Sequence, residues 1–478
     1  MKLIKNYLYN VAYQLFALIV PLLTVPYISR VLGPGGVGIN SFTGAVSSYF
    51  VLFGTLGINL YGQRQIAYAR ENVRQRNVVF TEILGLHFAL MSIATVTYLL
   101  FVLFSSDYTA YYWIQLITLF SAFLDVSWFF MGLEEFKKTV LRNFFVRIVS
   151  LVAIFIFVRN HSDVGLYIFI LAMAGFLGNL SLWSYLFKEK VFSTIRWKDL
   201  KIWRHFKPTF ALFLPQVAMQ IYLLLNRVVI GWFSSMTQVG FFDNSDKIVK
   251  MVLGIVTAIG TVMLPRIANV FKKGDSEQLE KYMRASFDFA TALSVPITIG
   301  LIVIAKPFSV VFLGAKFAGV DQIIAILALV IIPISWTTVL GTQFLLAVDR
   351  TSQFTKSVLV GAIVNIVLNF IFIPFFAARG AAISSTVAEY VVLGIQLYFV
   401  RNDAFARTIF TDFWKYLVGG LTIVPIAYGI YSLHLSDMMQ ILSVSVLAGI
   451  FYLIVIWFLK VNLRQTITSG IRNRFIRR

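Results

Sequence analysis

The chain has 478 residues, of which 59% are hydrophobic and only 13% are charged. Soluble domains carry about 25% charged residues, and no soluble core could bury so many separate apolar runs of about 20 residues, the length that crosses a bilayer. The net charge is +20, but the basic residues lie beside apolar runs, which favours membrane topology over nucleic-acid binding as its cause. Cysteine is absent, which excludes disulfides and thiolate metal sites.

Fourteen apolar runs predict an all-α, polytopic membrane protein with about 14 transmembrane helices. The predicted spans are 9–32, 38–60, 79–104, 111–133, 143–158, 164–187, 208–232, 241–265, 285–305, 320–346, 357–376, 382–400, 416–433 and 439–459. The first run lacks the small-residue cleavage site of a signal peptide, so we interpret it as a span that stays in the protein.

The connections between these spans alternate between basic and nearly uncharged. When the N-terminus is placed in the cytoplasm, the inward-facing segments hold 32 of the 41 lysines and arginines. The outward segments hold four, namely Arg159, Lys306, Lys316 and Arg379. This asymmetry predicts that both termini are cytoplasmic. All outer connections are short, so we expect no extracellular domain.

Two parts of the sequence resemble each other. Residues 29–33 (Ser-Arg-Val-Leu-Gly) precede Val37-Gly38, and residues 226–231 (Asn-Arg-Val-Val-Ile-Gly) precede Val239-Gly240. The two Val-Gly pairs are 202 residues apart, and further matches follow in the same order. We therefore predict two pseudo-symmetric lobes of six spans each, with the same orientation in the membrane. Parallel repeats of this kind surround a central cavity in many transporters.

The repeat predicts four regions. The N-lobe covers residues 1–190 and spans 1–6, and a basic cytoplasmic linker covers 191–207. The C-lobe covers 208–402 and spans 7–12. Residues 403–478 add two further helices and a basic cytoplasmic tail.

Arg30 and Arg227 occupy matching positions near the outer ends of spans 1 and 7. A charged side chain at mid-bilayer costs about 2.5–3.5 kcal/mol on insertion scales, so it usually faces a cavity or a partner. A repeated pair of guanidinium groups could hold phosphate oxygens in bidentate geometry. The alternative is snorkelling of both side chains to the outer headgroups, which does not require a repeated position.

Span 8 contains two acid-first pairs, Asp243 with Lys247 and Asp246 with Lys250. The i,i+4 spacing favours ion pairs on a helix, so the four charges could neutralise one another. The alternative is a switchable cluster, in which an anionic substrate takes the lysines and frees the aspartates for gating or ion coupling.

Arg147 near the inner end of span 5 and Asp125 in span 4 could pair across the N-lobe, or contact substrate. Glu389 is a carboxylate in span 12 with no charged neighbour within a turn, which makes it a candidate proton or cation site. Glu82 near an inner end is expected to be interfacial, and His205 falls in a loop or at its edge.

No enzyme motif is present. The chain has no phosphate-binding loop of the Walker type, no nucleophile–base pair, and no His pair with metal spacing. We therefore expect a protein that is not an enzyme, without a cofactor or a metal, and with H+ or Na+ coupling as an option.

Four blocks resemble the Wzx-like polysaccharide-unit flippases, a branch of the multidrug/oligosaccharidyl-lipid/polysaccharide exporter superfamily. The most specific block is residues 26–38 (Pro-Tyr-Ile-Ser-Arg-Val-Leu-Gly-Pro-Gly-Gly-Val-Gly), and the others are residues 227–231, 261–267 and 380–386. The seventh-span block often carries Asp before its basic residue, where this chain has Asn226. An ion-coupling role borrowed for that position is therefore in doubt.

The resemblance implies a flippase of the bacterial cytoplasmic (inner) membrane. Such proteins move an undecaprenyl-pyrophosphate-linked oligosaccharide from the inner to the outer leaflet by alternating access, for capsule, exopolysaccharide or O-antigen assembly. Implied partners are this lipid-linked substrate, membrane lipids, and the polymerase and glycosyltransferases of the pathway, with no nucleic acid. Arg30, Arg227, Lys247, Lys250 and Arg147 would then line the cavity for the pyrophosphate.

Three alternatives remain at this point. A lipid II flippase would share the anionic polyprenyl substrate. A cation-coupled multidrug exporter of the same fold would need a carboxylate-rich N-lobe, where this chain offers Asp125. A membrane-embedded glycan polymerase would need catalytic residues on a sizeable outer loop, which this chain lacks.

Overall fold

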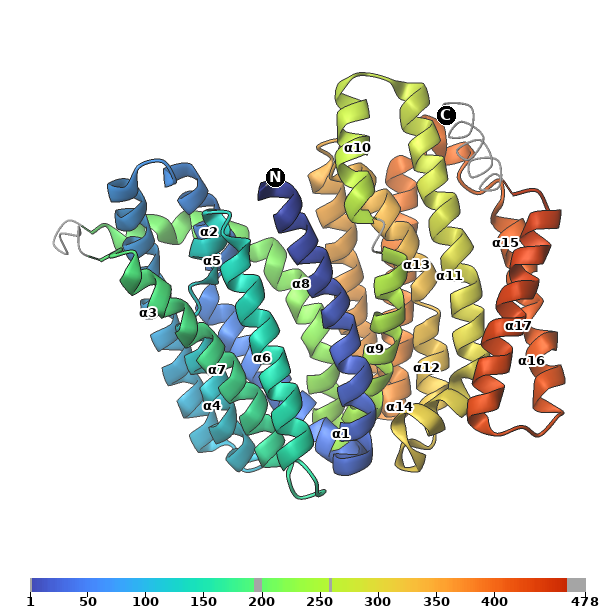
Figure 1. The fold of residues 1–478 in the computed structure, drawn as a ribbon, viewed down its shortest axis with the longest axis horizontal. Helices are drawn as coiled ribbons and strands as arrows, with labels where there is room; N and C mark the ends of the chain where they lie inside the picture. Colours follow the sequence, from blue (N-terminus) through green and yellow to red (C-terminus); the bar gives the residue numbers. More distant parts are fainter. Residues whose placement is uncertain (1, 193–199, 258–259, 462–478) are drawn as a thin grey trace. The chain divides into compact units, whose positions relative to one another are not determined.

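The structure is a computed structural model that describes residues 2–192, 200–257 and 260–461 (Figure 1). In these residues every regular element is helical. The elements are α1 (Lys2–Thr55), α2 (Ile58–Ala69), α3 (Val73–Phe104), α4 (Thr109–Phe123), α5 (Ser127–Gly132), α6 (Phe136–Phe157), α7 (Val164–Lys188), η2 (Ile202–His205), α8 (Phe206–Phe233), α9 (Met236–Thr257), α10 (Gly260–Lys272), α11 (Ser276–Leu313), η3 (Ala315–Phe317), α12 (Val320–Ala328), α13 (Ile331–Thr337), η4 (Thr338–Leu345), α14 (Thr351–Val400), η5 (Ala404–Arg407), α15 (Phe413–Leu421), α16 (Ile423–Tyr431) and α17 (Asp437–Phe458).

Each predicted span falls on one helix or on consecutive helices. The two longest helices each contain two predicted spans and a break between them. In α1 the break is at Gly33, with φ 71° and ψ 178°, a conformation that glycine adopts without steric cost. In α14 it is at Ala377, with φ 49° and ψ −125°. Residues 351–376 and 378–400 then lie side by side, because a Cβ on Gly361 would lie 2.2 Å from Val392.

Local capping fixes the ends of several helices. Asn72 precedes α3 and accepts a hydrogen bond from the backbone N–H of Gln75 at 3.1 Å. Asp275 precedes α11 and accepts one from Gln278 at 2.9 Å. Short polar side chains at these positions replace the partners that the first turn of a helix lacks. These two connections therefore lead into α3 and α11 through capped first turns.

By their internal contacts, the residues group into two compact units, Met1–Gly240 and Phe241–Arg478. Unit 1 has an aromatic core at one end of its helices, built around Phe80, Trp128 and Phe129. Unit 2 has a comparable core around Phe287, Trp336 and Phe344. This grouping places α8 with unit 1, whereas the repeat assigns span 7, which lies on α8, to the C-lobe. The lobe boundaries remain a prediction. Residues 193–199 of the predicted linker lie outside the described part of the chain.

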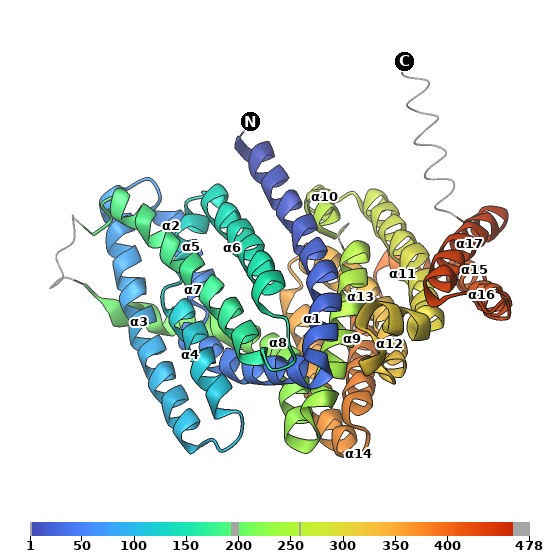
Figure 2. The ribbon, with the colours of Figure 1, turned by 60° about the horizontal axis from the view of Figure 1, so that its bottom comes forward.

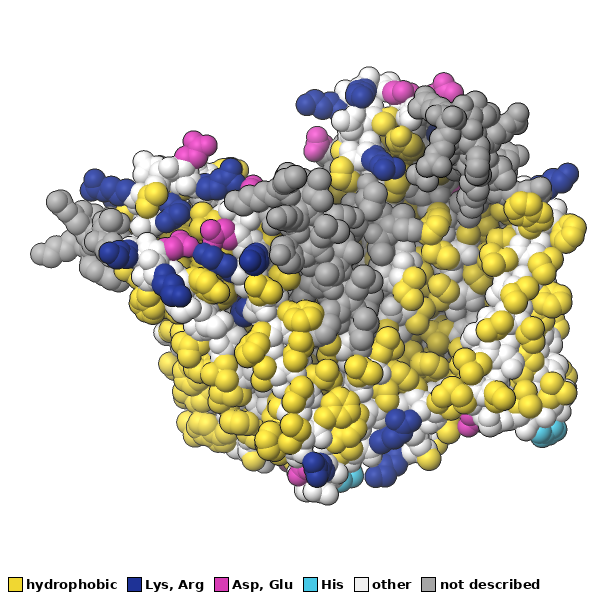
Figure 3. Space-filling model, in the orientation of Figure 1, with side chains coloured by type: hydrophobic (Ala, Val, Ile, Leu, Met, Phe, Trp, Pro, Cys, Tyr) yellow, Lys and Arg dark blue, Asp and Glu magenta, His cyan; other side chains and the backbone are white. Residues whose placement is uncertain are grey.

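Large apolar side chains cover the outside of many helices. Ten helices of the described part are long and apolar enough to cross a membrane. In unit 1, the surface over α4, α6 and α7 is almost wholly hydrophobic, and most of the Lys and Arg side chains gather at one end of these helices (Figure 3). The exposed side chains include Phe145 on α6 and Phe458 on α17, at 68% and 76%. In a water-soluble protein such surfaces would cause aggregation, so the chain is a multi-pass membrane protein.

The last helices, α15, α16 and α17, pack together on α11 in unit 2 (Figures 1 and 2). Tyr452 of α17 donates a hydrogen bond to the carbonyl oxygen of Ala292 on α11 at 2.7 Å. Tyr431 at the end of α16 donates one to Val303, also on α11, at 2.8 Å. These two bonds anchor the added pair of spans at two places on α11, about three turns apart.

Candidate functional site

Arg30 and Arg227 lie in the same local setting on two different helices. Arg30 is exposed on α1, three residues before the break, and its Nη1 lies 3.5 Å from the carbonyl oxygen of Pro26. Arg227 is half-buried on α8, and its Nη1 donates to the carbonyl oxygen of Leu223 at 2.8 Å. In both copies the guanidinium group therefore folds back over the preceding turn of its own helix. Both helices belong to unit 1 and pack against each other.

The glycines of the repeated motif bring its two copies into backbone contact. A Cβ added to Gly38 would lie 1.7 Å from the carbonyl oxygen of Met236 and 3.0 Å from the nitrogen of Gly240. A Cβ added to Gly240 would lie 2.0 Å from the carbonyl oxygen of Pro34. No other amino acid fits at either position without moving backbone atoms. Residues that the sequence pairs as copies thus touch each other within unit 1.

The charges of span 8 form both ion pairs that their spacing allows. On α9, the Nζ of Lys247 lies 2.5 Å from an oxygen of Asp243, and the Nζ of Lys250 donates to Asp246 at 2.7 Å. The carboxylate of Asp243 is the more buried of the two, with 3% of its side chain exposed against 15% for Asp246. The predicted ion pairs within the helix are therefore present in this structure. That the lysines leave the aspartates to bind an anionic substrate stays a prediction.

The structure places Arg142, rather than the predicted Arg147, beside Asp125. Asp125 lies in the break between α4 and α5, where it accepts a hydrogen bond from the backbone N–H of Ser127 at 2.9 Å. Its cationic partner is Arg142, with 4.0 Å between Nη1 and Oδ1. Arg142 is more than one turn closer to the start of α6 than Arg147, and it therefore lies beside the break that holds Asp125. Arg147 itself is half-buried on α6.

Glu389 is half-buried on the second half of α14. Its neighbours in the chain include Ser385 and Thr386, which are both buried on the same helix. The position is compatible with the predicted proton or cation site, whose function remains a prediction.

Sequence reasoning missed a buried polar cluster, because it placed Glu82 at the membrane interface and His205 in a loop or at its edge. Glu82 on α3 has 2% of its side chain exposed. It accepts hydrogen bonds from the backbone N–H of Lys201 at 2.7 Å, from Arg204, and from Nε2 of His205 at 3.0 Å. The other ring nitrogen of His205 lies 2.8 Å from the hydroxyl of Tyr61 on α2. No spacing in the sequence links these positions.

This Glu82 cluster fixes the segment that leads into α8. Ile202 packs into the core of unit 1 beside Gly85, where a Cβ would lie 2.8 Å from its side chain. Burial lowers the pKa of His205, and the hydrogen bond to Glu82 opposes that shift only in part. The imidazole is therefore neutral at pH 7 and bridges α2 and α3 to the start of α8.

Unit 2 contains an apolar cavity among its membrane-spanning helices. Its volume is about 290 Å³, and it lies between α9, α11, α16 and α17. Pro296 and Gly300 of α11 form one wall, and Ala448 and Gly449 of α17 form another. Small side chains at these places leave room for an apolar chain between the helices.

The fold is that of a polytopic membrane transporter. The structure of the lipid II flippase MurJ in an inward closed conformation matches 99% of this chain and 100% of its own, with a TM-score of 0.76 and 16% identity. An inward-facing MATE family transporter of the MOP superfamily matches 82% of this chain and 99% of its own, with a TM-score of 0.58 and 14% identity. These similarities confirm the predicted all-α polytopic fold class.

The chain belongs to the family described as "Polysaccharide biosynthesis protein", whose model matches residues 3–271. The "Putative O-antigen transporter" of Escherichia coli (strain K12) is 24% identical over 84% of this chain and 97% of its own length. The "Probable low-salt glycan biosynthesis flippase Agl15" of Haloferax volcanii is 19% identical over 51% of this chain and 52% of its own. The resemblance noted in the sequence is confirmed at the level of the family.

Proposed function

We propose that this chain is a lipid-linked glycan flippase, which moves an undecaprenyl-pyrophosphate-linked oligosaccharide repeat unit from the inner to the outer leaflet by alternating access. Membership of the polysaccharide biosynthesis family supports the substrate class. The similarity to proteins named for O-antigen transport and glycan flipping points in the same direction. The product would enter capsule, exopolysaccharide or O-antigen assembly.

The physical problem is the headgroup. A sugar pyrophosphate that enters hydrocarbon loses its hydrogen bonds to water and the solvation of its charge. A cationic path replaces that solvation, and the observation that carries the proposal is the repeated pair Arg30 and Arg227 in matching positions of two apolar helices. Lys247 and Lys250 would add charge where Asp243 and Asp246 release them.

The lipid part of the substrate has a different requirement. A polyprenyl chain stays in an apolar environment throughout the transfer, so it needs a groove or the bilayer itself. The cavity between α11 and α17 supplies apolar walls of the right kind within unit 2. We assign a short part of the isoprenoid chain to this cavity as part of the proposal, and the rest of the chain to the bilayer.

Net transport toward the outer leaflet requires a source of free energy besides substrate binding, because a ligand shifts conformations only through its differential affinity for them. Asp125, Asp243, Asp246 and Glu389 are the candidate carboxylates for H+ or Na+ coupling. Removal of the flipped product by a polymerase would have the same effect. The polymerase and the glycosyltransferases that supply the substrate are the expected partners at the bacterial cytoplasmic membrane. Both termini of the chain would face the cytoplasm.

The test is transfer of a fluorescent undecaprenyl-pyrophosphate oligosaccharide across proteoliposomes. Wild type is compared with Arg227→Ala, and Lys316→Ala on η3 is the control because it removes the same charge from an exposed site. Transfer by wild type and the control, with loss in Arg227→Ala, supports the proposal. No transfer by wild type, with or without an H+ or Na+ gradient, contradicts it.

Further arms of the same assay separate the alternatives. Lipid II replaces the oligosaccharide substrate in one arm, and a fluorescent lipophilic cation replaces it in another. A preference for lipid II would assign the chain to cell-wall precursor transport. Transport of the cation with no transfer of either lipid would identify a drug exporter. Sugar transfer by the purified protein would indicate a polymerase.

A further inference from the structure

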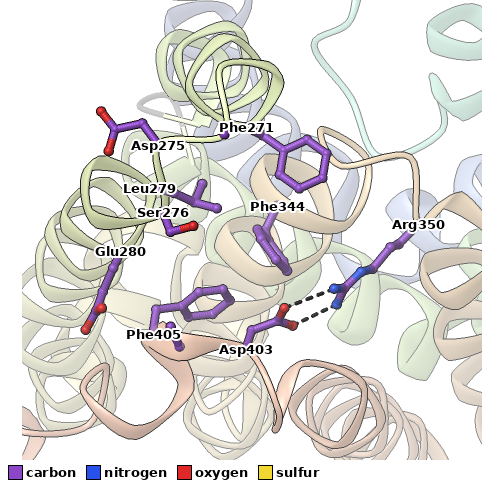
Figure 4. A pocket seen from close by; sticks show the side chains of 11 residues that line it. Phe271, Asp275, Ser276, Leu279, Glu280, Phe344, Arg350, Asp403 and Phe405 are labelled. Atoms are coloured by element: carbon purple, nitrogen blue, oxygen red, sulfur yellow. Dashed lines mark hydrogen bonds and ion pairs between the residues drawn. The ribbon is translucent and has the colours of Figure 1, made fainter.

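Unit 2 contains a second cavity. The apolar cavity lies among long helices, whereas this one lies among the connections between helices. It has a volume of about 230 Å³ and lies where three connections meet: the turn between α10 and α11, the end of η4 before α14, and η5 after α14 (Figure 4). These connections belong to segments that the charge pattern predicts on the inner side. The cavity is therefore expected on the cytoplasmic side.

The inner wall of this cavity is aromatic. Phe344 and Phe405 are each 2% exposed and pack edge to face, with 4.7 Å between ring centroids. Phe271 at the mouth is 45% exposed, which is unusual for a phenylalanine beside a polar connection. Leu279 of α11 completes the apolar part (Figure 4). A cavity of this size and lining fits one large apolar side chain as an anchor.

The rim is acidic. It carries three carboxylates, Asp275, Glu280 and Asp403, and one guanidinium group, that of Arg350. Arg350 is held by Asp403 through two hydrogen bonds of 2.7 and 3.0 Å, so its charge is already matched. The carboxylates of Asp275 and Glu280 remain at the edge, turned away from the aromatic wall (Figure 4). Excess negative charge here contrasts with the net charge of +20 of the chain.

An occupant with an aromatic anchor between basic residues would match both features. Residues 470–478 read Gly-Ile-Arg-Asn-Arg-Phe-Ile-Arg-Arg, with four arginines around Phe475 and no acid. They lie outside the described part of the chain. We propose that this basic segment docks in the cavity, with Phe475 against Phe344 and Phe405 and its arginines beside Asp275 and Glu280.

The chain is long enough for this contact within one molecule. Val461, the last described residue, belongs to a buried hydrophobic cluster that includes Ala292 of α11 and Tyr416 of α15. Twelve residues of α11 separate Ala292 from Glu280, which is about 18 Å at 1.5 Å per residue. The 14 residues from 462 to 475 can extend over about 45 Å. A tethered segment also has a high effective concentration at its site.

The consequence of docking is mechanical. The bound segment would add a further link between the ends of α10, α11 and α14 that border the cavity. It would therefore stabilise unit 2 and resist separation of these ends. This role is independent of the proposed substrate, since it involves neither Arg30 nor Arg227.

The experiment is site-specific cross-linking in native membranes. Because the chain has no cysteine, the double variant Ser276→Cys with Asn473→Cys gives one possible disulfide within a molecule and keeps Phe475. The matched control pairs Asn473→Cys with Thr411→Cys, which is exposed in the connection between η5 and α15, on the same predicted side of the membrane as the tail but outside the cavity lining. The expected result is a disulfide within the monomer for the pair Ser276→Cys and Asn473→Cys, and none for the control pair. The disulfide should form about tenfold more slowly when Phe475→Ala removes the anchor.

Every other outcome contradicts the proposal. A disulfide-linked dimer would mean that the segment occupies a second copy of the chain. Equal cross-linking in the Thr411→Cys control would mean that there is no preferred site. No cross-linking in membranes, with cross-linking only after anionic lipids are removed, would place the segment on the lipid surface. All variants are checked for monodispersity, so misfolding is detected separately.

Discussion

Gly38 and Gly240 are in backbone contact, although 202 residues separate them in the chain and each belongs to a different copy of the repeated motif. The absence of a side chain at both positions lets α1, just past its break at Gly33, meet the start of α9. Under the proposed alternating access, this contact would have to form and separate in every cycle. It is therefore a place where one methyl group can test the mechanism.

Gly38→Ala and Gly240→Ala should each reduce transfer to below about a tenth of wild type. The added methyl group would overlap a carbonyl oxygen, and overpacking of this kind costs about 1–3 kcal/mol in the closed contact. The control is Gly429→Ala on α16, where a Cβ meets nothing within 4 Å. Replacing a glycine inside a helix by alanine is otherwise neutral or stabilising. Normal transfer by both motif variants would mean that the contact does not close during transport.

Arg30→Ala and Arg227→Ala should each abolish surface polysaccharide while the protein remains in the membrane. Arg227→Lys should retain part of the activity, because lysine keeps the charge but loses the bidentate geometry. The measurement is complementation of a strain that lacks the gene, with immunoblotting of the membrane fraction. If both alanine variants export normally, the arginines serve only to snorkel, and the cationic path is wrong.

Lys247→Ala should destabilise the protein more than Lys250→Ala. Removal of Lys247 leaves the carboxylate of Asp243, whose side chain is only 3% exposed. Removal of Lys250 leaves that of Asp246, whose side chain is 15% exposed. Loss of a buried partner costs about 3–5 kcal/mol, and loss of an exposed one less than about 1 kcal/mol. Since Lys247 is itself partly exposed, we expect about 2 kcal/mol for the first variant.

Thermal unfolding in detergent measures this difference. The double variant Asp243→Asn with Lys247→Gln is the control, because it removes both charges and should recover most of the loss. Equal melting temperatures for the two single lysine variants would show that burial of Asp243 has no effect on its pairing.

The stability of unit 1 should fall as the pH drops below about 6.5, the ordinary pKa of histidine. Burial lowers the pKa of His205 in the folded state. In that window the unfolded chain binds a proton that the folded chain does not, so the free energy of unfolding decreases with falling pH until the lowered pKa is reached. Melting temperatures between pH 7.5 and 5 should show this loss in wild type and a smaller one in His205→Gln. An identical slope in both proteins would exclude His205 as the titrating group.

Much of the architecture follows from the sequence alone, because membrane helices are determined by local properties. Apolar length sets each span, and i,i+4 spacing sets pairs such as Asp243 with Lys247. The predicted division between spans 1 and 2 falls on Gly33, and that between spans 11 and 12 falls on Ala377. The repeated Arg30 and Arg227 were also visible as a pattern. Such features depend on neighbours within a few turns of the chain.

Only the tertiary structure decided which distant residues meet. It paired Asp125 with Arg142 rather than Arg147, buried Glu82 against His205, and brought Gly38 to Gly240. The cavity beside Phe344 is built from three connections that are about 130 residues apart at their extremes. Spacing in the sequence does not encode these contacts, because each depends on how long helices rotate and cross when their apolar faces pack. The sequence determined where the chain crosses the membrane, and the packing determined which of its charges became partners.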